Sequence, residues 1–193
     1  LQSICLYVIT DFVWREVQRD RGRMKFLVFD ECWKLLKNEA GMVFIEEVFR
    51  TFRKYFASAI AISQDIDDFA KSKIAGAILP NCAIKWVLMQ QQSDPVRIKE
   101  ALDLNDNELA LVKSLRQEKG VYSEAFLIAQ KERILTVIES TPLEYWIATT
   151  DPKDLAKVEE AAQRDAGSDP VSILKSLAEK YPHGVAAFEK GVR

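Results

Sequence analysis

Apolar residues recur every three or four positions over the first seventeen residues. This spacing places them on one side of a helix, so it predicts an amphipathic helix at the start of the chain. The helical pattern is already under way at Leu1, with no Met and no capping residue before it. We therefore expect the chain to be a piece of a longer protein. The apolar positions are Cys5, Ile9, Phe12, Val13 and Val17.

Three short apolar runs, at residues 26–30, 59–63 and 83–89, predict strands. The first is a continuous apolar run, which is typical of a parallel strand buried on both faces. Helical patterns lie between the runs, at residues 42–57 and at 65–79, where Pro80 closes the second helix. Alternation of strands and helices in this order predicts an α/β fold with a parallel sheet.

The period changes near residue 120. Helices are expected at 95–102 and 107–115, followed by β-rich runs at 121–129 and 133–139 whose short separation predicts a β-hairpin. Beyond Pro142 we expect a loop, and then a tail with helices at 154–164 and 170–180. The sequence thus predicts an α/β region over residues 1–152 and a helical C-terminal tail over 153–193.

Composition is typical of a soluble globular domain. The 193 residues are 48% hydrophobic and carry a net charge of −2, so no overall positive field recruits nucleic acid. The apolar runs are too short to cross a membrane. The three cysteines are not spaced like metal ligands, and their sequence neighbours are apolar. We therefore expect buried free thiols in a reducing compartment, the cytoplasm. The tryptophans expected in the core are Trp33, Trp86 and Trp146.

The strand at 26–30 ends in two adjacent carboxylates, Asp30 and Glu31. Side chains at the carboxyl ends of strands lie where open α/β sheets bind ligands. In P-loop ATPases this position carries acids that hold Mg²⁺ and orient the attacking water. The alternative is that Asp30 only caps the helix that follows.

Gln64 and Arg53 are further candidates. Gln64 follows the strand at 59–63, so its amide could lie beside the acids and contact a phosphate or a water. It could equally be a turn residue that caps the next helix. Arg53 lies on a basic stripe of the helix at 42–57 and could reach the nucleotide of a neighbouring subunit. Its alternative is a solvated helix face.

Taken together, these segments resemble the ATPases of type IV secretion and conjugation systems of the TraC type. The resemblance covers residues 1–152. It is carried by the sequences KFLVFDECWKLL (25–36), FRKYFASAIAISQD (52–65) and ESTPLEYWIATTDP (139–152), with a further match at 81–88.

The resemblance implies part of a RecA-like P-loop NTPase domain, a three-layer sandwich with a mostly parallel sheet, a β-hairpin and the helical tail. It implies a motor that hydrolyses ATP with Mg²⁺ to drive pilus assembly and DNA transfer. Such motors are hexamers that meet other channel components at the cytoplasmic side of the inner membrane. The implied roles are Mg²⁺ coordination through water for Asp30, activation of the attacking water for Glu31, γ-phosphate sensing for Gln64 and a trans finger for Arg53.

The sequence departs from the family in one respect, because it contains no Gly-x-x-x-x-Gly-Lys-Ser/Thr loop to hold the phosphates. We therefore expect this chain alone to bind ATP poorly and not to hydrolyse it. In the family the strand that carries this loop lies between the strands at 59–63 and 83–89. Without it, those two strands should pair directly or a partner chain should fill the gap.

Two other functions fit the same residues. A DNA translocase or helicase would share the acid pair and Gln64, but it should have basic and aromatic loops for strand contact. The basic clusters, at residues 19–25 and 50–54, have no stacking platform among them. A non-catalytic interaction module would use the helical tail to dock a neighbouring subunit or a channel component. The alternative for the tail is that it packs back on its own domain.

Overall fold

The computed structural model describes residues 2–90, 93–165 and 167–191. It divides into two compact units, each described here by itself. The first contains Leu1–Lys85, Gln90–Leu111 and Ile128–Glu132, and the second contains Trp86–Met89, Val112–Leu127 and Arg133–Arg193.

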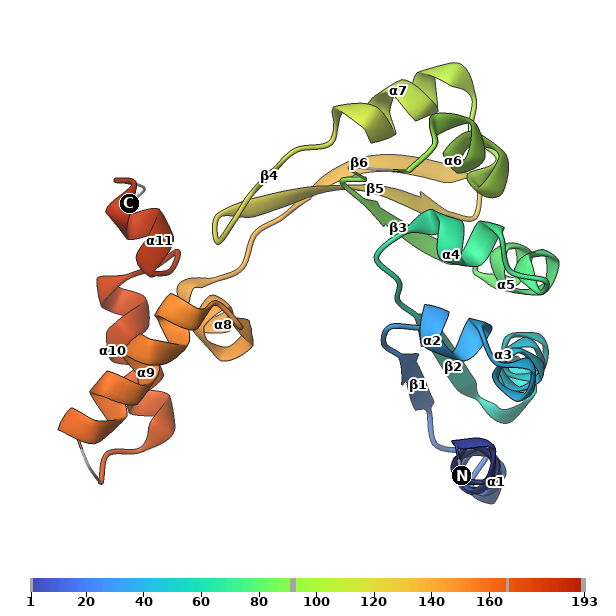
Figure 1. Cartoon of the computed structure of the whole chain (residues 1–193), viewed down its shortest axis with the longest axis horizontal. Helices are drawn as coiled ribbons and strands as arrows, with labels where there is room; N and C mark the ends of the chain where they lie inside the picture. Colours follow the sequence, from blue (N-terminus) through green and yellow to red (C-terminus); the bar gives the residue numbers. More distant parts are fainter. Residues whose placement is uncertain (1, 91–92, 166, 192–193) are drawn as a thin grey trace. The chain divides into compact units, whose positions relative to one another are not determined.

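The first unit is built on two parallel strands, β1 (Lys25–Phe29) and β2 (Ala57–Ala61) (Figure 1). They pair in register, from Lys25 opposite Ala57 to Phe29 opposite Ala61. The backbone N–H of Ile62 donates to the carbonyl of Phe29 at 2.9 Å, which continues the pairing past the strand ends. Both strands therefore end at the same edge, as the sequence predicts for a parallel α/β unit.

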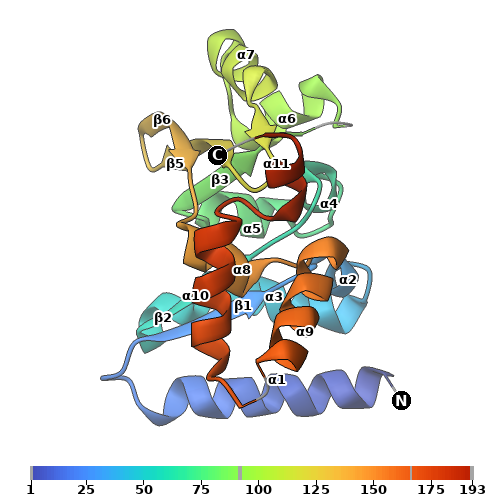
Figure 2. The ribbon, with the colours of Figure 1, turned by 90° about the vertical axis from the view of Figure 1, so that its left-hand side faces the viewer.

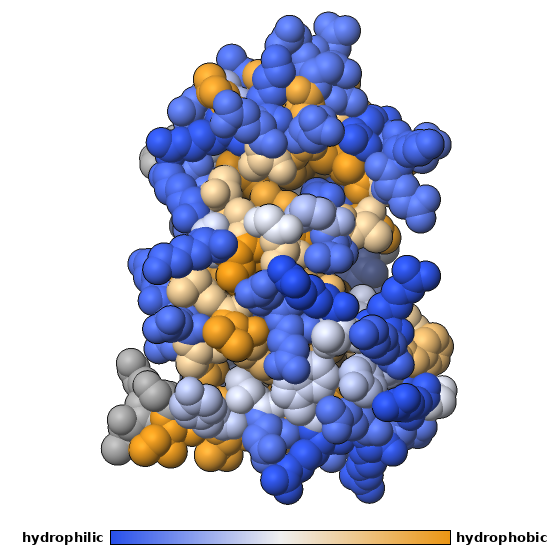
Figure 3. Space-filling model, turned by 90° about the vertical axis from the view of Figure 1, so that its right-hand side faces the viewer, coloured by the Kyte–Doolittle hydropathy of each residue, from blue (hydrophilic) through white to orange (hydrophobic). Residues whose placement is uncertain are grey.

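β1 is not buried on both faces, so that prediction is wrong. Phe26 and Val28 are 62% and 52% exposed, whereas the alternate residues Leu27 and Phe29 pack on the core of the unit. The reason is that the core cluster covers one face of the strand pair. Figure 3 shows a different face of the molecule, where hydrophobic patches, in orange, lie between hydrophilic residues in blue.

Helix α3 (Glu39–Thr51) supplies the centre of this core through Ile45 and Val48, which are fully buried. It begins before the predicted residue 42 because the side chain of Asn38 caps it, accepting hydrogen bonds from the next backbone N–H groups. The helix is followed by a 3₁₀ turn, η1 (Phe52–Tyr55). The remaining helices in this part of the chain are α1 (Gln2–Arg19), α2 (Trp33–Leu36), α4 (Ile66–Ala70), α5 (Ala75–Asn81), α6 (Pro95–Leu102) and α7 (Asp106–Ser114).

The helix predicted over 65–79 is in fact two helices, α4 and α5. Asp65 caps α4 by accepting a hydrogen bond from the backbone N–H of Asp67. Pro80 lies inside α5 and does not close it. Its φ is compatible with a helix, and the short α5 continues for only one more residue.

Helix α1 confirms the predicted amphipathic helix at the start of the chain. Val17 is buried and Val13 and Trp14 pack on the core, yet Phe12 remains 64% exposed. Cys5 is also exposed, so the expectation that all three cysteines are buried is wrong. Among the described residues, no helix combines the length and apolarity that crossing a membrane requires.

A second sheet consists of β3 (Ile84–Leu88), β4 (Gln117–Glu118), β5 (Tyr122–Ala129) and β6 (Glu132–Ile138), in the order β3-β5-β4 with β6 also paired to β5. The pairing of β5 with β6 confirms the predicted hairpin, and Gln130 has the positive φ of a tight turn. β2 and β3 belong to different sheets, so direct pairing between them is wrong. A partner chain between them stays a prediction. Trp86 on β3 is 56% exposed, which corrects its assignment to the core.

Residues beyond Pro142 form helix α8 (Pro142–Ala148), where a loop was expected. Pro142 stands at the first helical position, and Thr141 and Glu144 form a reciprocal capping box. Trp146 on this helix is 2% exposed, as predicted for a core residue, and its indole N–H donates to the carbonyl of Tyr181 at 2.8 Å.

The tail forms α9 (Pro152–Arg164), α10 (Pro170–Lys180) and a short α11 (Val185–Glu189) that the sequence pattern did not reveal. α10 packs against both α8 and α9 (Figure 2). The division into domains at 1–152 and 153–193 stays a prediction. The buried apolar residues of this core are Trp146, Ala161, Ile173, Leu177, Ala178 and Val185.

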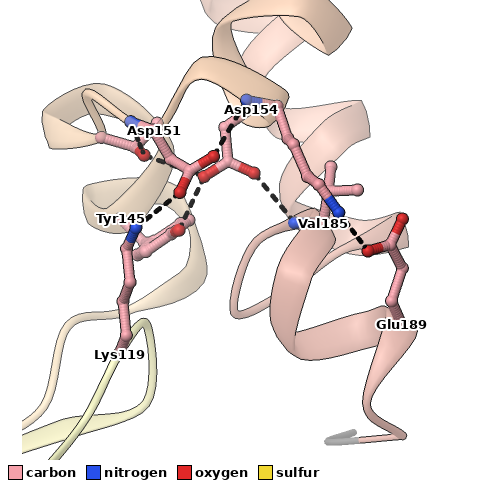
Figure 4. A network of polar contacts seen from close by, with 8 residues as sticks. Lys119, Tyr145, Asp151, Asp154, Val185 and Glu189 are labelled. Carbon is pink, nitrogen blue, oxygen red and sulfur yellow. Dashed lines mark hydrogen bonds and ion pairs between the residues drawn. The ribbon is translucent and has the colours of Figure 1, made fainter.

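Asp154 connects the helices of the second unit (Figure 4). It is 1% exposed, and one of its oxygens accepts hydrogen bonds from the hydroxyls of Tyr145 at 2.6 Å and Thr149 at 2.8 Å. The other accepts from the backbone N–H of Val185 at 2.8 Å. Burial, with the neighbouring Asp154 carboxylate, raises the pKa of Tyr145 to about 12, so this hydroxyl stays a neutral donor. The network joins α8, α9 and α11.

Replacing Gly41 with Ala should destabilise the chain. An added Cβ would lie 2.5 Å from the backbone oxygen of Leu35, so the first turn of α3 must shift. Overpacking of this kind costs about 1–3 kcal/mol. The matched control is Gly76→Ala in α5, where nothing lies within 4 Å of the added atom. The control should be neutral or stabilising by up to about 1 kcal/mol. Urea unfolding followed by circular dichroism measures both, and equal effects would contradict the packing described.

Asp154→Asn should also destabilise the chain. The variant keeps the shape but replaces one acceptor with a donor, which leaves buried hydroxyl or N–H groups unpaired. Hydrogen bonds to a charged group are worth about 1.5–3 kcal/mol each, so a loss of about that size is expected in thermal or urea unfolding. Asp165→Asn, at an exposed surface pair with Arg164, serves as the control and should change nothing measurable. A loss no greater than that of the control would refute the anchoring role.

Candidate functional site

The candidate site lies where β1 and β2 end. Since the strands are parallel and in register, Asp30 and Glu31 after β1 come to the same edge as Gln64 after β2. Gln64 Nε2 donates a hydrogen bond to Glu31 Oε1 at 2.7 Å. The structure therefore brings together two of the predicted residues that are 33 positions apart in the sequence.

Glu31 lies in the left-handed region, with φ 51°. Its backbone N–H donates to Asp30 Oδ1 at 2.9 Å, and its carboxylate also accepts a hydrogen bond from the indole N–H of Trp33. The bonds from Trp33 and Gln64, in that order, hold the pKa of Glu31 below its usual value. Glu31 is therefore ionised at neutral pH, as a water-activating carboxylate must be.

Asp30 does not cap the following helix. The cap position of α2 is Cys32, and no side chain there accepts a hydrogen bond. Instead, Asp30 is exposed, and one of its carboxylate oxygens accepts a hydrogen bond from the backbone N–H of Glu31. An exposed carboxylate with a second oxygen available fits the predicted role of holding Mg²⁺ through water.

Carboxylates in the described ranges do not form a metal centre by themselves. No group of three or more His, Cys, Asp or Glu side chains there could hold an ion. In nucleotide sites Mg²⁺ is bound by one or two carboxylates together with waters and substrate phosphates. Asp30 as a metal residue stays a prediction.

Gln64 is not the capping residue of the next helix either. That position belongs to Asp65, which caps α4 and also accepts a hydrogen bond from the hydroxyl of Ser93 at 2.8 Å. Gln64 itself is exposed, and its amide contacts Glu31. Its side chain is thus available at the edge where the acids lie.

Arg53 lies away from this edge. It is in η1, which precedes β2, whereas Gln64 follows β2, so the two residues lie beyond opposite ends of the strand. Arg53 is exposed and makes no hydrogen bond or ion pair within the part of the chain that the structure describes. It does not join the acids in this chain, and its role as a trans finger stays a prediction.

A comparison with protein families bears on the fold. The family described as the TraG P-loop domain matches residues 1–180. The chain belongs to the TraG P-loop domain family. The match extends through α10 and so includes part of the tail that the sequence resemblance left aside.

Two relatives of this TraG P-loop chain have the same protein name. The proteins called type IV secretion system protein virB4 from Bartonella quintana and Bartonella henselae are each 28% identical over 109 residues. These residues are 56% of this chain and 14% of each relative. The structure of VirB4 of Thermoanaerobacter pseudethanolicus matches with a TM-score of 0.59 and 28% identity, over 72% of this chain and 37% of that one. The chain thus spans a minor part of these relatives' length, and the predicted α/β fold of the P-loop NTPase kind is confirmed.

Sequence reasoning missed the contact between Trp33 and Glu31. Trp33 was assigned to the core, yet it is only half-buried and its indole N–H donates to the carboxylate. The spacing Glu-Cys-Trp across a turn was the available signal, because residues two apart in a tight turn can approach each other.

The pKa of Glu31 in this TraG P-loop chain should lie below that of an ordinary glutamate. Of the two hydrogen bonds to Glu31, the one from Trp33 lowers the pKa more. Trp33→Phe removes it and should therefore raise that pKa more than Gln64→Ala does. Because the folded-state pKa is lowered, the bonds stabilise the fold above the unfolded-state pKa. That contribution is lost as pH falls through the folded value. NMR titration of the glutamate carboxyl carbons measures the shifts, and a Glu31 that titrates normally in the unmodified chain would contradict the geometry.

Proposed function

We propose that this chain is part of an ATP-hydrolysing motor that energises type IV secretion, with conjugative pilus assembly and DNA transfer as its work. Support comes from the TraG P-loop family match and from relatives named for the type IV secretion system. The observation that carries the proposal is the contact between Glu31 and Gln64 at the carboxyl edge of the parallel strands.

Glu31 acts as the carboxylate that activates water. It accepts a hydrogen bond from a water molecule and directs that water's oxygen at the terminal phosphorus of ATP. A bond forms between the water oxygen and phosphorus, the bond to the ADP oxygen breaks, and the water's protons are released through Glu31 and solvent. The negative charge of Glu31 at neutral pH supports this role, because only the ionised form can take a proton from the water.

Asp30 and Gln64 act on either side of this carboxylate. Asp30 would hold Mg²⁺ through water, and the ion, when bound, neutralises charge on the phosphates. Gln64 senses the γ-phosphate through its amide, which can donate to a phosphate oxygen and accept from a water. The bond from Gln64 to Glu31 supports a link between phosphate sensing and water activation.

The 193-residue chain alone is proposed to be inactive. It contains no Gly-x-x-x-x-Gly-Lys-Ser/Thr segment, which in P-loop enzymes supplies the backbone N–H groups and the lysine that hold the phosphates. Without these groups, Asp30 and Glu31 would face a polyphosphate of the same charge sign, which disfavours binding.

In the assembled motor we propose a hexamer, in which the exposed Arg53 reaches the nucleotide of the neighbouring subunit. The hexamer would meet other secretion-channel components at the cytoplasmic side of the inner membrane. A charged side chain that makes no hydrogen bond or ion pair among the described residues supports a role in trans, since an arginine finger needs its guanidinium free for the transferred phosphate.

A DNA translocase or helicase is less well supported. Some basic residues of the two clusters are already engaged, since Arg50 pairs with Glu46 at 2.8 Å and Lys25 Nζ donates to the carbonyl of Val17 at 2.9 Å. Arg21 lies over the ring of Tyr55, 4.8 Å from its centroid. These contacts leave fewer charges for a phosphate backbone. An interaction module formed by the tail remains the alternative if ATPase activity is absent.

The test is ATPase activity of a version extended upstream to include a phosphate loop. That version should hydrolyse ATP, and Glu31→Gln in it should lower kcat by a factor on the order of 10²–10⁴, the usual contribution of a general base. The 193-residue chain should be inactive in the same assay.

Glu139→Gln provides the matched control, because Glu139 is an exposed carboxylate of the second unit and is not among the candidate site residues. Its activity should equal that of the extended parent. An extended, folded and assembled protein without activity would refute the motor and favour the interaction module. Full activity of the Glu31→Gln variant would refute Glu31 as the water-activating group.

A further inference from the structure

Both oxygens of the Glu31 carboxylate have a donor of their own. Gln64 Nε2 donates to Oε1 at 2.7 Å, and the indole N–H of Trp33 donates to Oε2. One donor on each oxygen fixes both the direction and the plane of the carboxylate. A carboxylate has about four lone-pair positions, so the two that remain can still accept from water.

The backbone brings Trp33 and Glu31 together through one rigid turn. Glu31 has φ 51°, a conformation that is uncommon for residues with a side chain. The turn is held by hydrogen bonds from Cys32 N to the carbonyl of Ile62 at 2.9 Å and from Lys34 N to the carbonyl of Glu31 at 3.0 Å. Cys32, between the two residues, is fully buried.

Core packing does not account for Trp33. It is half-buried and is not among the residues that pack on the cluster around Ile45 and Val48. Its ring instead lies beneath two cations, with Lys37 Nζ 4.1 Å and Lys34 Nζ 5.6 Å from the centroid. Cation–π contacts of this kind hold the ring in place while its N–H donates a hydrogen bond to the Glu31 carboxylate.

We propose that Trp33 is a positioning residue that aims the Glu31 carboxylate, a role that rests on the proposed function of Glu31. An indole N–H donates a hydrogen bond but does not titrate in proteins, so it neither gives nor takes a proton in the reaction. It is also uncharged, so it orients the carboxylate without cancelling the negative charge that water activation needs. A lysine or arginine at this place would neutralise that charge.

Nuclear magnetic resonance of the 193-residue chain tests the contact without any ATPase activity. The chain has four tryptophans, and loss of one indole N–H signal in Trp33→Phe identifies that of Trp33. Glu31→Ala should move this signal upfield and speed its exchange with water, because the acceptor is gone. Glu139→Ala should leave it unchanged. A Trp33 signal that does not respond to Glu31→Ala overturns the proposal.

Kinetics of the version extended through a phosphate loop tests the positioning role. Trp33→Phe keeps an aromatic ring beneath the lysines and removes only the N–H. It should lower kcat by a factor on the order of 10–100, the usual cost of a misplaced catalytic group, with KM for ATP and the melting temperature nearly unchanged. Trp86→Phe, which alters an exposed indole on β3, is the control and should keep full kcat.

The outcomes separate the two proposals. If the extended protein is active and loses activity in Glu31→Gln, but Trp33→Phe retains full kcat, the positioning role is wrong and the motor stands. If Trp33→Phe changes KM and the melting temperature in place of kcat, Trp33 is structural and the positioning role is again wrong. An inactive extended parent overturns the motor, and the positioning role falls with it.

Discussion

The parallel pairing of β1 with β2 is the constraint on which the site depends. The register from Lys25–Ala57 to Phe29–Ala61 brings both strands to a common end. Without that register, Glu31 and Gln64 would not approach within hydrogen-bond distance. Ile45 and Val48 of α3 are fully buried in the core that covers one face of the two strands, and this packing stabilises the pairing. The chemistry at the edge is thus positioned by apolar packing several residues away.

The Glu31 carboxylate at that edge is oriented by uncharged hydrogen-bond donors. Trp33 and Gln64 both donate to Glu31, and Asp30 accepts from its backbone N–H. The bonds from Trp33 and Gln64 keep the carboxylate in place as an anion and lower the pKa of Glu31, while its charge stays available to a ligand. An ion pair with a basic side chain would have stabilised the fold at the expense of that charge.

Much of the fold follows from local sequence, and the exceptions have physical causes. The parallel strands, the β5–β6 hairpin and α10 were predictable because period and turn chemistry agree there. Helix α8 was missed because aromatic residues after Pro142 obscured a capping box at Thr141. The exposed face of β1 could not be predicted, since an apolar run does not say which faces are covered.

The site was predicted in part for the same reason. Their positions at strand ends made Asp30, Glu31 and Gln64 candidates, and the contact between Glu31 and Gln64 bears out their closeness but not their roles. The contact from Trp33 depends on the left-handed turn at Glu31. The most direct test of the account is a structure of the version extended through a phosphate loop, bound to Mg²⁺, ADP and aluminium fluoride. The account predicts a water in line with the fluoride mimic that donates to the Glu31 carboxylate, with Trp33 still on its other side. A water held by a different residue, with Glu31 turned away, would contradict it.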